Sequence, residues 1–172
     1  MMTRRSRGRE VALQVLYQVE QNPGMSSDEI RRFIQRRLLE DRKLCEFTEA
    51  LIAGVHEHQT RIDTMISDLA ENWRLDWMAA IDRNILRLGA YEMLFHPEVP
   101  AKVAINEALE LAKRYSTAQS SRFVNGILDR MLQHQTQEAG SHPNPEASQD
   151  PVPDPGPESS SVESDPDEPK AG

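Results

Sequence analysis

The chain has 172 residues, and its 20 Lys and Arg side chains against 28 Asp and Glu give a formal net charge of −8. No apolar run approaches the roughly 18 residues that a membrane-spanning helix requires, which excludes a helical membrane protein. A single cysteine, Cys45, excludes an internal disulfide framework and a cysteine-based zinc cluster, and it favours a reducing, cytoplasmic compartment.

The excess negative charge lies in a C-terminal segment, residues 138–172. This segment holds nine Asp and Glu, one Lys and eight of the eleven prolines, and Val152 and Val162 are its only large aliphatic residues. It cannot bury enough apolar surface to offset its ordering entropy, so we expect a disordered acidic tail. Residues 1–137, with 19 basic and 19 acidic side chains, are expected to form one domain with a single core.

Apolar residues recur at helical spacing almost throughout residues 1–137. The spacing predicts a first helix over about residues 5–20, and a cluster of Asn, Pro and Gly then ends it. Ser27 is the predicted N-cap of a second helix. Two further apolar stripes, over residues 44–55 and 62–69, predict either two helices with a bend between them or one long helix.

The second half of the domain continues the helical pattern. Asp76 is the predicted N-cap of a helix that runs to His96, and two prolines mark the loop that follows. The next helix is expected over about residues 100–115, and either Thr117 or Ser120 begins the last one. Since no segment alternates long enough to form a strand, we predict an all-α protein, a compact bundle of six to seven helices.

Motifs for catalysis are missing from the sequence. The glycines are too scattered for a phosphate-binding loop or a dinucleotide fingerprint. His56-Glu57-His58 resembles a metal motif, but positions i and i+2 of a helix lie about 200° apart and cannot share an ion. Glu107 and Glu110 lie one turn apart without a nucleophile beside them. We therefore predict a protein that is not an enzyme and needs no metal or cofactor.

Four arginines, Arg4, Arg5, Arg7 and Arg9, lie in the first nine residues, which contain no acid. They crowd the start of the first helix, where the helix dipole favours negative charge. One interpretation is a solvated basic end, because charge runs are commonly that. The other is an arm that binds RNA phosphates, since guanidinium groups match phosphate oxygens in pairs and never lose their charge.

A second candidate site lies at the start of the last helix. Arg122 and Phe123 could supply a cation and a ring on which an unpaired base stacks, as single-stranded RNA requires. Phe123 also fits the apolar stripe of this helix, so a core position remains the alternative. Duplex DNA is the weaker hypothesis, because no helix carries a convincing set of base-reading side chains.

Four blocks of sequence together resemble the NusB family of bacterial transcription antitermination factors. They include the arginine-rich start, Asp82-Arg83-Asn84-Ile85-Leu86-Arg87, Val103-Ala104-Ile105-Asn106-Glu107-Ala108 and Arg122-Phe123-Val124-Asn125-Gly126. Their order and spacing match over about residues 3–133. The family often has an acidic residue before the serine of the last-helix motif, where this chain has Gln119.

The resemblance implies a non-enzymatic factor built from two small helical bundles. Such factors pair with the small-subunit ribosomal protein NusE, bind the boxA element of nascent ribosomal RNA and help the RNA polymerase antitermination complex read through terminators. By motif, the residues that resemble RNA contacts are Arg4, Arg5, Arg7, Arg9, Arg122 and Phe123. Tyr17 and Asp82 resemble the surface that faces NusE, where an acid would meet a basic protein.

Two other hypotheses remain open at this point. The chain could be a relict of the NusB-like domain found in certain ribosomal RNA cytosine methyltransferases, although it lacks a cofactor loop. It could also be a homodimer that buries the arginine arm, or one that exchanges for the heterodimer with NusE. Finally, the acidic tail could compete weakly with RNA for the arginines, since it is tethered to them.

Overall fold

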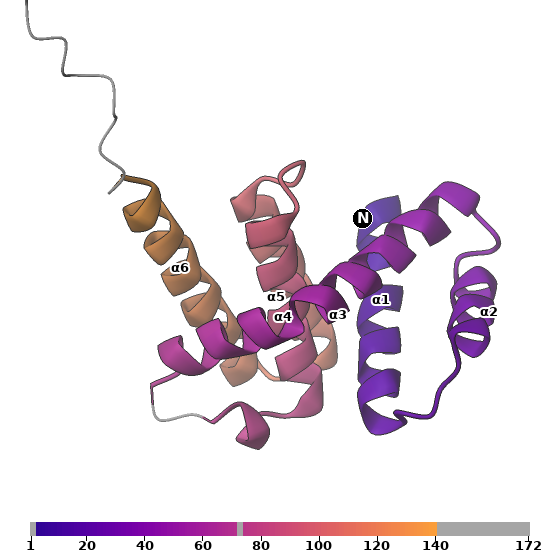
Figure 1. Ribbon diagram of the computed structural model, residues 1–172, viewed down its shortest axis with the longest axis horizontal. Helices are drawn as coiled ribbons and strands as arrows, with labels where there is room; N and C mark the ends of the chain where they lie inside the picture. Colours follow the sequence, from indigo (N-terminus) through magenta and orange to yellow (C-terminus); the bar gives the residue numbers. More distant parts are fainter. Residues whose placement is uncertain (1–2, 72–73, 141–172) are drawn as a thin grey trace, which may run out of the picture. The chain divides into compact units, whose positions relative to one another are not determined.

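The computed structural model describes residues 3–71 and 74–140, and side chains as far as residue 137. These residues form six α-helices and one short 3-10 helix, and they contain no strand, which confirms the predicted all-α bundle (Figure 1). In chain order the elements are α1 (Arg4–Gln21), α2 (Ser27–Arg37), α3 (Arg42–Leu69), η1 (Leu75–Trp77), α4 (Ala80–Phe95), α5 (Ala101–Tyr115) and α6 (Ala118–Gly140).

The starts of α1 and α2 are fixed by capping side chains. The backbone N–H of Ser6 donates to Thr3 Oγ1 at 3.0 Å, so Thr3 caps α1. Ser26, and not the predicted Ser27, caps α2, because Ser26 and Glu29 form a reciprocal capping box. The sequence carries this signal, a serine followed three residues later by a glutamate, and the prediction was wrong by one position.

Helix α3 continues without a break for 28 residues, which decides between the two predictions for this segment in favour of one long helix. Gly54 lies at its middle, where α3 crosses α4. A Cβ atom at Gly54 would lie only 2.0 Å from Cζ of Tyr91. Gly54 therefore permits the close approach of two helices, and it does not bend α3.

The prediction that Asp76 caps α4 is wrong. Asp76 lies in η1, where Arg74 Nη2 donates to its carboxylate at 3.3 Å, and the N-cap of α4 is Ala79. The 3-10 turn uses the residues that the sequence pattern had assigned to the start of the helix. At the last helix, which begins at Ala118, the backbone N–H of Ser120 donates to Thr117 Oγ1 at 3.0 Å, which favours Thr117 over Ser120 as the capping residue.

Two apolar clusters form the core. The larger one is built from α1 and α3 to α6, and the smaller one lies among α1, α2 and the start of α3. Leu51 and Ile62 of α3 belong to the larger cluster, and Leu44 and Cys45 of the same helix belong to the smaller one. The two clusters match the two small bundles that the family resemblance implied, and α3 runs through both.

The backbone of α6 continues to Gly140, three residues beyond the domain boundary expected at residue 137. The rest of the predicted acidic tail, residues 141–172, lies outside the described residues. Within the described part of the chain, no helix is long and apolar enough to cross a membrane.

Candidate nucleic-acid interface

Arg4 and Arg5 lie exposed in the first turn of α1. Arg4 forms an ion pair with Asp41, the N-cap of α3, and its side chain keeps 74% of its surface exposed. The Arg5 guanidinium lies 5.4 Å from the centre of the Phe47 ring. Exposed ion pairs contribute only about 0–1 kcal/mol, so an incoming phosphate can replace these contacts at little cost.

Arg7 is half-buried and bonded to Glu10, one turn further along α1. Glu10 also accepts hydrogen bonds from Arg114 at 3.1 Å and from Tyr115. Burial raises the pKa of the Glu10 carboxyl, but the hydrogen bonds from Tyr115, Arg7 and Arg114 outweigh it and leave the pKa below its ordinary value. Glu10 therefore links Arg7, at the basic end of α1, to α5.

Arg9 is buried and lies apart from the other three arginines. Its Nε and Nη2 donate to the Glu92 carboxylate of α4 at 2.8–3.0 Å, and its Nη1 lies 3.6 Å from Glu107 of α5. Only 3% of Arg9 is exposed, so it is not available on the surface where the sequence had placed it. The exposed part of the predicted arm is formed by Arg4 and Arg5, and Arg7 is half-buried beside them.

At the last helix, Arg122 is exposed and Phe123 is half-buried. One side of Phe123 packs against the larger apolar cluster, and the ring also lines a surface pocket with Asp82, Trp77 and Ser120. The core and surface interpretations of Phe123 therefore describe two sides of the same ring.

Asp82 and Tyr17, the residues expected to face a protein partner, lie at neighbouring pockets. Asp82 is 8% exposed, and its Oδ1 has no hydrogen-bond partner among the described residues. It shares its pocket with Phe123, whereas Tyr17, at 40% exposed, lines the next pocket along. The two pockets have Ala79 in common, so the start of α4 brings the predicted RNA and protein contacts together.

Trp77 is a surface residue that the sequence reasoning missed. Its side chain is 66% exposed in η1, it lines the pocket of Asp82 and Phe123, and the Arg74 guanidinium lies 5.5 Å from its ring centre. A tryptophan in a short connection between helices was the available signal, because large aromatic side chains are uncommon on bare surfaces.

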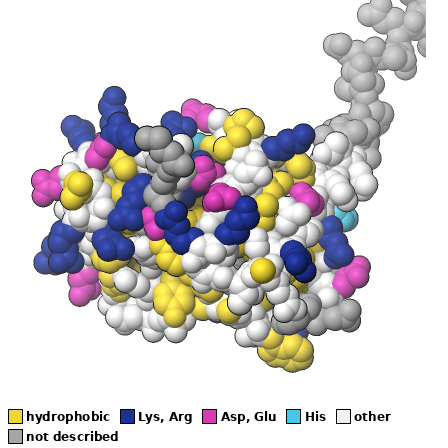
Figure 2. All heavy atoms as spheres, turned by 180° about the vertical axis from the view of Figure 1, so that it is seen from behind, with side chains coloured by type: hydrophobic (Ala, Val, Ile, Leu, Met, Phe, Trp, Pro, Cys, Tyr) yellow, Lys and Arg dark blue, Asp and Glu magenta, His cyan; other side chains and the backbone are white. Residues whose placement is uncertain are grey.

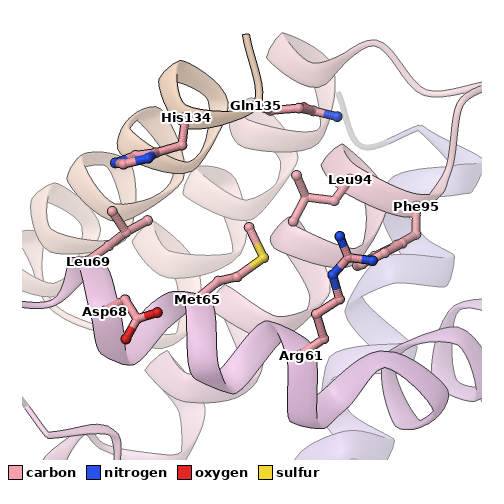
Figure 3. Close-up of a pocket in the computed structure, with 8 residues that line it drawn as sticks. All are labelled: Arg61, Met65, Asp68, Leu69, Leu94, Phe95, His134 and Gln135. Carbon is pink, nitrogen blue, oxygen red and sulfur yellow. The ribbon is translucent and has the colours of Figure 1, made fainter. Parts of the chain in front are cut away.

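A third pocket lies among α3, α4 and α6, and Figure 3 shows the side chains that line it. Met65, Leu69 and Leu94 supply much of the wall, and Arg61 stands at 5.2 Å from the centre of the Phe95 ring. None of the predicted site residues lines this pocket. Among the residues with described side chains, no group of three or more His, Cys, Asp or Glu is arranged to hold a metal ion.

The sequence matches a known protein family. The model of the NusB family matches residues 6–133. The transcription antitermination protein NusB of Anaeromyxobacter dehalogenans is 44% identical over 131 residues, which cover 76% of this chain and 92% of that protein.

Solved structures show the same fold. T. maritima NusB is 38% identical and superposes with a TM-score of 0.68, over 77% of this chain and 93% of its own. A complex of the antitermination factors NusB and NusE with double-stranded RNA contains a chain with a TM-score of 0.69 at 23% identity, over 78% of this chain and 99% of that chain. The chain described here belongs to the NusB family.

Proposed function

We propose that this chain is a transcription antitermination factor that binds the boxA element of nascent ribosomal RNA together with the ribosomal protein NusE. The observation that carries the proposal is the match to the NusB family over residues 6–133, with relatives named as transcription antitermination proteins. A solved relative of the same fold is held in a complex with NusE and RNA. On this proposal the protein acts in the cytoplasm, within the RNA polymerase antitermination complex, and it is not an enzyme.

The RNA contacts of the proposal are cations at two helix starts, where Arg4, Arg5 and Arg122 are exposed and Arg7 is half-buried. Arg4, Arg5 and Arg7 bind phosphates at the start of α1, and Arg122 does so at the start of α6. Phe123 offers the exposed side of its ring to an unpaired base. Arg9 is paired with Glu92 inside the protein, so on this proposal it holds α1 to α4 and does not bind phosphate.

The NusE contacts of the proposal are the two neighbouring pockets at the start of α4. A buried carboxylate oxygen without a partner, such as Oδ1 of Asp82, gains a hydrogen bond when a basic side chain of a partner enters the pocket. Tyr17 adds an aromatic ring with a hydroxyl group, which is a common anchor at protein interfaces.

Fluorescence anisotropy with a labelled boxA RNA, with and without NusE, tests the proposal. Four phosphate contacts to a single strand predict a slope of about −3 in the plot of log affinity against log salt. Replacing Arg4 and Arg5 with Gln should make that slope shallower by about 1.4. Replacing Asp82 with Asn should weaken NusE binding and leave the salt slope for RNA alone unchanged. Wild-type protein that binds boxA RNA no better than a scrambled RNA, with NusE present, would reject the proposal.

A further inference from the structure

A second arginine cluster lies on α2. Residues 30–38 hold four arginines and no acid, the same numbers as residues 1–9, and the two segments together supply eight of the 19 basic side chains of residues 1–137. Since residues 1–137 are neutral overall, the rest of that region carries the compensating negative charge. The positive charge is thus concentrated in two short segments, residues 1–9 and 30–38, and the proposed function uses only the first.

Helix α2 presents two of these arginines to solvent on one face. Ile34 is fully buried in the smaller apolar cluster, whereas Arg32 and Arg36 are exposed. They lie four residues apart, which places them about 6 Å apart along the helix axis on the side opposite Ile34. Arg32 Nε donates to the Asp28 carbonyl at 3.2 Å, and Arg36 Nε donates to the Arg32 carbonyl at 3.4 Å.

Carboxylates near this face are already engaged by other groups. Asp28 lies 3.9 Å from Arg31, and Glu29 accepts hydrogen bonds from the backbone and hydroxyl of Ser26 in the capping box. Asp41 is paired with Arg4. Among the described residues, neither Arg32 nor Arg36 has a carboxylate within ion-pair distance, and both side chains are exposed to solvent. The serine hydrogen bonds of the capping box, and to a smaller extent the charge of Arg32, lower the pKa of Glu29.

Two contacts connect the end of α2 and the residues after it with α1. Asp41, just beyond α2, binds Arg4, and Arg37 Nη2 donates to Gln14 of α1 at 2.9 Å. Figure 2 shows Lys and Arg side chains gathered on the side of the molecule formed by these elements. Arg42 and Lys43, both exposed at the start of α3, follow the α2 cluster along the chain and come directly after Asp41, the partner of Arg4. Basic residues therefore follow the chain from α2 to the start of α3, where Asp41 pairs with Arg4 of α1.

Helix stability alone does not account for this arrangement. Cations in the last turn of a helix interact favourably with its dipole, which explains the positions of Arg36 and Arg37. Arg32 lies at the middle of α2, where that interaction has faded, because it is confined to the terminal turns. The guanidinium groups of Arg32 and Arg36 are exposed and lie one turn apart. A row of exposed cations of this kind can contact successive phosphates of an RNA backbone.

We propose that the exposed face of α2, with Arg32 and Arg36 at its centre, binds the sugar-phosphate backbone of RNA that continues beyond the segment held by the α1 arm. This inference rests on the proposed function and extends it with a second RNA surface. The contact is made to phosphates and is independent of base sequence, because guanidinium groups on a helix face without an adjacent ring read charge and spacing only.

The experiment compares a boxA RNA with the same RNA lengthened by about twelve nucleotides at either end, using full-length protein and anisotropy. Wild-type protein should bind a lengthened RNA about tenfold more tightly, with a salt slope steeper by about 1.4. The double variant Arg32→Gln and Arg36→Gln should lose this gain and keep its affinity for the short RNA. The matched control, Arg61→Gln and Arg130→Gln, removes the same charge from exposed positions of α3 and α6 and should keep the gain.

Each other outcome has a definite meaning. Equal gains in the α2 variant and the control would overturn the α2 surface and leave the proposed function intact. Failure of wild-type protein to bind either RNA would overturn both. The competing occupant is the acidic segment of residues 141–172. If the α2 variant leaves both RNA affinities unchanged but loses binding of a labelled peptide of that sequence, the tail, and not RNA, is the partner of α2. Circular dichroism of each variant verifies that α2 is still folded.

Discussion

The arginines of α1 have the same side chain and very different surroundings. Arg5 touches one aromatic ring at the surface, whereas Arg9 is enclosed by Phe47 and two carboxylates from α4 and α5. Removing an exposed cation changes little, but removing one partner of a buried ion pair leaves an uncompensated charge in a low-dielectric interior. At the scale of single residues, the exposure of an arginine side chain therefore separates arginines that can bind a ligand from arginines that stabilise the fold.

We expect Arg9→Ala to lower the free energy of unfolding by about 3–5 kcal/mol, because it strands the Glu92 carboxylate. Arg5→Ala, the matched control on the same helix, should cost less than about 1 kcal/mol. Urea denaturation followed by circular dichroism measures both. Similar small losses in the two variants would show that the buried pair does not hold α1 to α4.

Alanine substitutions at two helical glycines, Gly54 and Gly126, are expected to have opposite effects on stability. A methyl group at Gly54 would collide with the Tyr91 ring, so Gly54→Ala should destabilise the protein by about 1–3 kcal/mol. A methyl group at Gly126 meets no atom within 4 Å, so Gly126→Ala should stabilise α6 by up to about 1 kcal/mol through helix propensity. Thermal unfolding compares the two variants, and a stabilised Gly54→Ala protein would contradict the close crossing of α3 and α4.

Part of the interface could be predicted from the sequence because its signals are local. The arginines of α1 and the Arg122-Phe123 pair stand out from their neighbours in the chain. The burial of Arg9 could not be predicted in this way, since Glu92 lies 83 residues away and only the packing of α1 on α4 brings the two together. The same holds for Asp82 and Phe123, which come from different helices and line one pocket.

At the scale of helices, most bounds follow from apolar spacing and capping residues. The apolar stripes placed α1 and α5 within about one residue of their observed ends. The errors lie at helix starts, where one side chain decides the first residue. At α4 the chain uses a 3-10 turn in place of a capping aspartate, and the pattern of residues around Asp76 contains no clear signal for that choice.

The capping box of α2 gives a prediction with a neighbouring control. Ser26→Ala should cost about 1 kcal/mol, because it removes the acceptor for the backbone N–H of Glu29 and the hydroxyl that meets its carboxylate. Ser27→Ala should have almost no effect, since no hydrogen bond of the Ser27 side chain stabilises the helix start. Chemical denaturation of the two variants measures the difference, and the reverse order would restore Ser27 as the cap.

The junction of α1 and α5 predicts a dependence of stability on pH. The folded pKa of Glu10 lies below its ordinary value of 4.5, so the unfolded chain binds more protons than the folded one between those two values. The stability contributed by Glu10 is therefore complete above pH 4.5 and is lost as the pH falls through the folded pKa. The difference in unfolding free energy between wild type and Glu10→Gln should shrink on acidification from pH 7 to pH 3. A constant difference would exclude Glu10 as the titrating group.

At the scale of the whole molecule, the distribution of charge matters more than its sum. Residues 1–137 are neutral, yet their cations gather along the α1 and α2 side of the bundle. An approaching polyanion is thus drawn to one side of the protein before any specific contact forms, and added salt weakens that attraction. The neutral domain and the acidic tail can be predicted from the sequence, whereas the contact between the start of α1 and the start of α3 depends on how the helices pack.

The unbroken course of α3 through both apolar clusters has a consequence for how the protein comes apart. Leu44 and Leu51 belong to one continuous helix but to different apolar clusters. Unfolding of either bundle therefore disrupts packing contacts in the other. Scanning calorimetry of the full chain should record a single heat-absorption peak whose calorimetric and van't Hoff enthalpies agree. Two resolved peaks would mean that α3 does not couple the two bundles and that each bundle unfolds at its own melting temperature.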